Sequence, residues 1–63
     1  MKVYYRLYAK FEGQKRFKPL DLSTGQQVIN LIHATMIPKE NLGKIEEIMQ
    51  QNPNIHFQLE TIR

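Results

Sequence analysis

Residues 3–11, VYYRLYAKF, alternate between two sets of side chains, and this stretch decides the fold. In an extended chain, one face would carry Val3, Tyr5, Leu7, Ala9 and Phe11. The other face would carry Lys2, Tyr4, Arg6, Tyr8 and Lys10. A period of two with aromatic enrichment predicts a β-strand buried on one side only. The rest of the chain must therefore cover the face of Leu7.

A second strand is expected to return antiparallel to the first. Glu12-Gly13-Gln14 is typical of a turn, and residues 16–20 follow it as the returning strand. Pro19 cannot donate a ladder hydrogen bond, so this strand should be short, lie at an edge or end there.

The register of this hairpin decides where Phe17 lies. A two-residue loop at 13–14 suits a type II′ turn and would place Phe17 beside Lys10 on the outer face. A three-residue loop would place Phe17 on the side of Phe11. Because burying a phenylalanine stabilises a fold by about 2 kcal/mol, we predict the odd loop and a buried Phe17.

Residues 23–37 fit two structures. Ser23-Thr24-Gly25-Gln26 matches a helical capping box, and the apolar residues that follow fill one arc of a helical wheel. The same residues include a β-branched series that suits a strand, and Gly25 would be costly in a first helical turn. We predict a turn at 22–27 and a third strand near 29–37, and the helical alternative stays open.

The remaining chain predicts one helix and one strand. Pro38 suits a helix start, and residues 38–51 carry an apolar stripe that ends before Asn52-Pro53-Asn54. The stripe consists of Leu42, Ile45, Ile48 and Met49. Ile55, Phe57 and Leu59 then alternate with polar residues as a final strand.

The expected fold is a single α+β domain over residues 1–63. Its small, mostly antiparallel sheet has the order β-β-β-α-β, with one helix packed on one face. The alternative, with residues 23–36 helical, is β-β-α-α-β.

Composition and charge limit the classes of function. Residues 1–18 carry six basic side chains and one acidic side chain, hence +5; residues 19–63 carry three basic and five acidic, hence −2. This asymmetry suggests an anionic partner for the N-terminal part. The chain has no cysteine and no apolar run of the ~18 residues that a membrane helix needs. We expect a cytoplasmic protein without disulfides or membrane spans.

The outer face of the hairpin is the predicted binding site. Tyrosines on a sheet can stack bases while lysines and arginines neutralise phosphates, and Tyr and Arg are also enriched at protein interfaces. Tyrosine also simply favours strands, and edge lysines discourage aggregation. The predicted site residues are Tyr4, Arg6, Tyr8, Lys10, Arg16 and Lys18.

No catalytic or metal-binding pattern accompanies this face. His33 and His56 are far apart in the sequence and have no cysteine partners. Asp21 and Ser23 are better explained by turn formation than by catalysis. The chain contains no G-x-S-x-G, H-E-x-x-H or P-loop motif. We expect no enzymatic activity, no cofactor and no metal.

Two stretches carry a resemblance. Residues 16–37, RFKPLDLSTGQQVINLIHATMI, and residues 38–63, PKENLGKIEEIMQQNPNIHFQLETIR, together resemble small uncharacterised proteins of Gram-positive phages and conjugative elements. The resemblance implies a mobile-element origin and a role as a regulator or inhibitor that binds host or phage proteins, or DNA. It implies no catalytic or binding residue.

These observations favour a protein-interaction module that binds a protein partner or itself. A chain of 63 residues without disulfides or metals has a small core, and such domains often gain stability by forming oligomers. We expect a homodimer formed through the open sheet face or an edge strand. The alternative is a nucleic-acid-binding module that uses the same face.

Overall fold

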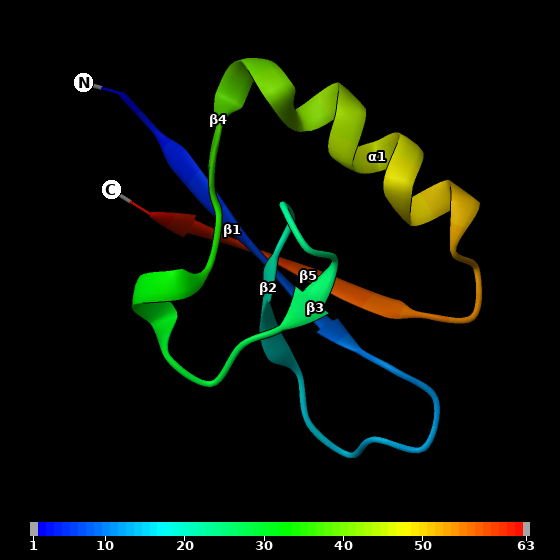
Figure 1. The fold of residues 1–63 in the computed structure, drawn as a ribbon. Helices are drawn as coiled ribbons and strands as arrows, with labels where there is room; N and C mark the ends of the chain where they lie inside the picture. The colour runs from blue at the N-terminus through cyan, green and yellow to red at the C-terminus, as the bar shows by residue number, and fades with distance from the viewer. Residues whose placement is uncertain (1, 63) are drawn as a thin grey trace.

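The computed structural model describes residues 2–62 and shows an α+β fold, a small antiparallel sheet with one helix on one face (Figure 1). The strands are β1 (Tyr4–Lys10), β2 (Lys18–Asp21), β3 (Gln26–Gln27), β4 (Met36–Pro38) and β5 (His56–Ile62). The helical elements are the 3-10 turns η1 (Leu31–His33) and η2 (Lys39–Asn41), and the helix α1 (Leu42–Gln51). The predicted fold class is confirmed.

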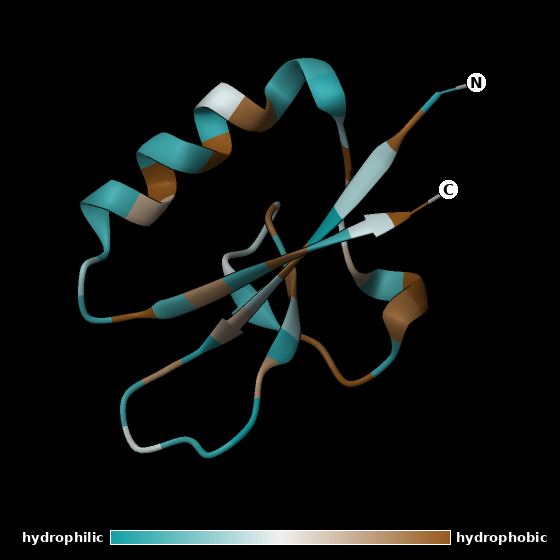
Figure 2. Ribbon diagram, turned by 180° about the vertical axis from the view of Figure 1, so that it is seen from behind, coloured by the Kyte–Doolittle hydropathy of each residue, from teal (hydrophilic) through white to brown (hydrophobic). Residues whose placement is uncertain are grey.

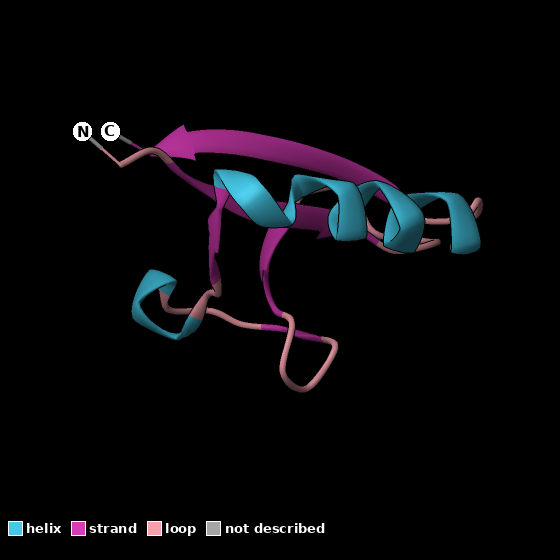
Figure 3. Cartoon of the chain, turned by 90° about the horizontal axis from the view of Figure 1, so that it is seen from above, coloured by secondary structure: helices cyan, strands magenta, loops and turns pink. Residues whose placement is uncertain are grey.

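β1 is the central strand, and its two sides are used differently. β5 pairs with it over its whole length, from Tyr4 opposite Ile62 to Lys10 opposite His56. On the other side, β4 pairs with its first half and β2 with its second half. β2 and β4 then leave the β1–β5 ribbon and extend toward β3 and η1 (Figure 3).

The core is small and is built on the face of β1 that the alternation predicts. Its buried residues come from β1, β2, β4 and α1: they are Leu7, Ala9, Leu20, Ile37 and Ile45. Tyr5, Phe11 and Phe57 pack partly buried against them. In α1, Ile45 is the buried residue, and Ile48 and Met49 of the predicted stripe are half-buried.

A turn forms at Glu12-Gly13-Gln14 as predicted, but the connection from β1 to β2 covers residues 11–17 and is longer than the predicted loop. Gln14 N donates to Phe11 O over 3.0 Å, and Phe11 N donates to Gln14 Oε1 over 2.8 Å. Gly13 has φ +86°, which glycine adopts most readily. Ala9 then lies opposite Lys18, and Tyr8 opposite Pro19.

The predicted position of Phe17 is wrong. The even register places Phe17 on the outer face, where the Lys10 ammonium lies 5.2 Å from the centre of its ring. Phe17 stays 37% exposed. With Ala9 opposite Lys18, the strand alternation puts Phe17 on the same face as Lys10, and the cation–π contact with Lys10 offsets part of the lost burial.

A strand precedes α1, as predicted, but it occupies only the end of the predicted range 29–37, and the alternative helix does not form. Of the turn predicted at 22–27, residues 22–25 form a turn, with Asp21 O accepting hydrogen bonds from Thr24 N and Gly25 N, whereas Gln26–Gln27 form the short strand β3. β4 covers only Met36–Pro38, and η1 is a single 3-10 turn. Asn30 Oδ1 accepts from Ile32 N over 3.1 Å and so caps η1. The helical residues then begin at Lys39, directly after Pro38, close to the predicted start.

Candidate interaction surface

Four of the six predicted site residues share the outer face of β1. Tyr4, Arg6, Tyr8 and Lys10 alternate with the core residues of that strand, as predicted. β5 brings Gln58 opposite Tyr8 and Glu60 opposite Arg6 on the same face. β5, which the sequence predicted as the final strand, thus adds the carboxylate of Glu60 to the basic face.

Glu60 is hydrogen-bonded to the two central residues of this face, Arg6 and Tyr8. Arg6 Nη1 donates to Glu60 Oε1 over 2.7 Å, and the Tyr8 hydroxyl donates to the same oxygen over 3.0 Å. The Tyr8 hydroxyl, followed by the Glu60 carboxylate, raises the pKa of the Arg6 guanidinium above its usual value. The Arg6 side chain is 17% exposed. Arg6 is therefore a paired and largely covered cation, and less open to an anionic ligand than the sequence analysis expected.

Arg16 and Lys18 do not join these four residues. Arg16 lies in the connection between β1 and β2 and is exposed. Lys18 is also exposed, but it pairs with the buried Ala9, so its side chain leaves β2 on the side of the core. The predicted six-residue surface is thus divided between the outer face, the hairpin loop and the opposite side of β2.

A hollow of 360 Å³ opens beside this outer face. It is lined by Tyr8, Phe17, Gln58, Leu59 and Glu60. Two aromatic side chains and one carboxylate therefore border the same space, and Lys10 lies over the ring of Phe17.

A second surface was missed by sequence reasoning: the apolar segment 29–36, defined by Ile29, Leu31, Ile32 and Met36. Ile29 is 100% exposed and Ile32 is 79% exposed. Leu31 and Met36 are about half exposed, and η1 contains no buried residue. In Figure 2 the loop before η1 and much of η1 are brown, with short teal stretches between the apolar parts.

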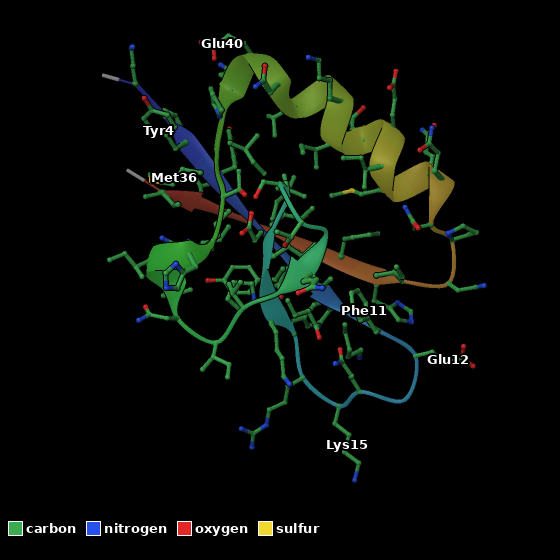
Figure 4. The ribbon with its side chains drawn as sticks, in the orientation of Figure 1. Tyr4, Phe11, Glu12, Lys15, Met36 and Glu40 are labelled. Atoms are coloured by element: carbon green, nitrogen blue, oxygen red, sulfur yellow. The ribbon has the colours of Figure 1, made fainter. Side chains whose placement is uncertain are left out.

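The apolar segment adjoins the outer face of the sheet. Met36 lies opposite Arg6 in the β4–β1 pair, and Pro38 lies opposite Tyr4. Figure 4 shows Met36 and Tyr4 close together at the N-terminal end of β1. Both surfaces can therefore contact a single partner. The sequence signal for the exposed segment is Asn30, a polar capping residue within the apolar run.

The remaining polar residues form turns. Asp21 Oδ1 accepts from Ser23 N over 3.0 Å and from Ser23 Oγ over 2.6 Å. These hydrogen bonds with Ser23 lower the pKa of the Asp21 carboxyl. Residues 2–62 contain no group of three His, Asp or Glu side chains arranged to hold a metal ion. Within the same residues, no helix has the length and apolar character needed to cross a bilayer.

Comparisons with protein-family models, with curated proteins and with solved structures find no match to this chain. The resemblance to small phage and conjugative-element proteins therefore stays a prediction.

Proposed function

We propose that this protein is a non-enzymatic interaction module that binds another protein through the apolar segment 29–36. The observation that carries the proposal is the exposure of four large apolar side chains within eight residues of a chain whose buried core is itself small. Grouped apolar side chains outside a core are typical of protein-binding surfaces.

The surroundings of the segment suit a protein partner. The outer face beside it offers Tyr4 and the paired Arg6, the residue types most enriched at interface hot spots. Because Glu60 already neutralises Arg6, a partner would not have to supply a counter-charge there. An apolar centre with a polar border is the usual arrangement of such interfaces. The regulatory or inhibitory role implied by the phage resemblance would be exerted through this binding.

Replacing Ile29 and Ile32 with aspartate should strongly weaken partner binding and leave the fold intact. Both side chains are mainly in solvent, so the free energy of unfolding should change by less than about 0.5 kcal/mol per site. Loss of hot-spot contacts should weaken binding by at least about tenfold. The measurement is quantitative mass spectrometry of proteins retained by the immobilised wild type and by the variant.

The matched control is Gln50→Asp with Gln51→Asp, which adds the same two charges to exposed positions of α1. Proteins retained by the wild type and by this control, but lost from the Ile29/Ile32 variant, support the proposal. Retention of the same proteins by all three would contradict it.

The aromatic hollow favours nucleic-acid binding as a second candidate function. Phe17 and Tyr8 border a space of 360 Å³, and Lys10 and the exposed Arg16 lie on the same hairpin. A base could stack on an aromatic ring there while the cations contact phosphates. Glu60 in the same hollow opposes an anion, so we rank this function second.

If the second function holds, a single-stranded oligonucleotide should bind at low salt and dissociate as salt rises. Replacing Lys10 and Arg16 with alanine should weaken binding and reduce the salt dependence by about two counterions. Replacing Lys39 and Lys44, which are exposed elsewhere, makes the same change in net charge and should have less effect. Fluorescence anisotropy measures the affinity for the oligonucleotide and its salt dependence. Absence of binding at low salt rejects this function.

A further inference from the structure

We infer that two copies of this chain associate through β5, whose free edges pair antiparallel about Leu59. This inference deepens the proposed interaction role by naming a second copy of the chain as a partner, and it rests on a surface other than the apolar segment 29–36.

β5 is a long edge strand. Its seven residues all pair with β1 in one continuous register, without a bulge. Among residues 2–62, no strand pairs with its other edge. Figure 3 shows β5 at the border of the molecule, with no helix or strand beyond it. Alternate residues of the strand therefore present their backbone N–H and C=O groups outward.

The strand lacks the features that normally protect such an edge. Native proteins block edge strands with lysine, proline, bulges or charges. The residues of β5 are HFQLETI, which include no lysine, proline or glycine. Its one charged side chain, Glu60, is held by Arg6 and Tyr8 of its own chain. An exposed strand of this composition is suited to pairing with another strand.

The sequence of β5 complements itself. In an antiparallel pair centred on Leu59, His56 lies opposite Ile62 of the second copy and Phe57 lies opposite Thr61. Gln58 lies opposite Glu60, and Leu59 lies opposite the second Leu59. No like charges meet. Glu60 Oε1 accepts both bonds from its own chain, so Oε2 can accept a hydrogen bond from the Gln58 amide of the second copy.

This register uses the strand best. The register centred on Leu59 pairs all seven residues of β5. A register centred on Gln58 would pair fewer residues of the strand. A register centred on Glu60 would place the two Glu60 carboxylates opposite each other. Like charges directly opposite destabilise a strand pair. Leu59 lies opposite Leu7 on the core side of the sheet, yet its side chain is 38% exposed in the single chain. The register centred on Leu59 would bury this side chain against the Leu59 of the second copy.

The small core gives the second copy a role in stability. The five clustered core residues include one alanine, and small domains without disulfides commonly need oligomerisation. Pairing the two β5 strands would join two β1–β5 ribbons into one sheet and add about six to eight backbone hydrogen bonds.

Analytical ultracentrifugation over micromolar to submillimolar protein concentrations measures the dimer dissociation constant and tests the inference. The variants change the charge at Gln58, which is exposed. Gln58→Glu places a carboxylate opposite Glu60 of the other copy, and the symmetric dimer contains two such pairs. The repulsion should raise the dimer dissociation constant roughly fivefold. Gln58→Lys faces the same two carboxylates and should lower it by a similar factor. Gln51→Glu and Gln51→Lys on α1 are the matched controls and should change it little.

Leu59→Lys places two ammonium groups on the two-fold axis and should leave monomers. The Ile29/Ile32 variant should still form dimers, so the two interaction surfaces can fail separately. A wild type that stays monomeric at submillimolar concentration overturns the inference. A dimer on which the two Gln58 substitutions act in the same direction, or on which Leu59→Lys has no effect, overturns it as well.

Discussion

Leu7→Ala should leave most of the protein unfolded at room temperature. Leu7 lies in the middle of β1, is 1% exposed and belongs to the core cluster that joins the sheet to α1. Truncating a buried leucine to alanine costs about 2–5 kcal/mol, because the lost transfer energy is joined by a cavity. A core in a chain this small supplies only about 3–5 kcal/mol of net stability. Denaturant unfolding followed by circular dichroism measures the difference.

Leu31→Ala is the matched control, since the same atoms are removed from a side chain that is 47% exposed in η1. It should change the free energy of unfolding by less than about 0.5 kcal/mol. Both variants must be compared at one protein concentration, because association of the folded chain would raise its apparent stability. Similar losses from the two substitutions would mean that Leu7 is not the centre of the core.

The parts of the fold that follow a clear period were predictable from the sequence. The period of two in β1 identified the core face, and the apolar stripe identified α1. Both elements are long enough for several residues to repeat the same signal.

Residues 28–35 could not be predicted in this way. Their apolar residues fit a strand or a helix, and both interpretations assumed that apolar side chains are buried. The core is filled by β1, β2, β4 and α1, which leaves no buried site for Ile29 or Ile32. Local hydrogen bonding by Asn30 then sets a 3-10 turn at the surface. How much apolar surface a core can accept is a property of the whole chain, so a local pattern does not reveal it.

The candidate site was predictable only for residues within one strand. Tyr4, Arg6, Tyr8 and Lys10 share a face because of strand alternation alone. The neutralisation of Arg6 by Glu60 depends on β5 lying next to β1 in one register, across 54 positions of the chain. The error at Phe17 had a similar origin, since its position depends on how β2 pairs with β1 after a connection of residues 11–17, and the gain from burying one ring did not decide that pairing.

Ile45→Ala should release α1 from the sheet. Ile45 is 4% exposed and is the buried residue of a ten-residue helix, whereas Ile48 and Met49 pack only partly buried against the core, so we expect Ile45 to provide the largest share of the contact between α1 and the core. Helices shorter than about 12–15 residues are marginal in water without tertiary contacts. The substitution should cost about 2–5 kcal/mol and lower the helical circular dichroism signal more than the strand signal.

Hydrogen exchange separates this outcome from global unfolding. Backbone amides of α1 in the Ile45→Ala variant should exchange faster than those of β1, because the β1–β5 pairing does not involve Ile45. Ile32→Ala makes the same chemical change at a side chain that is 79% exposed and should leave both regions protected. If the two isoleucine variants behave alike, α1 is not held by Ile45, and the stability of the fold resides in the β1–β5 ribbon and its contacts with β2 and β4.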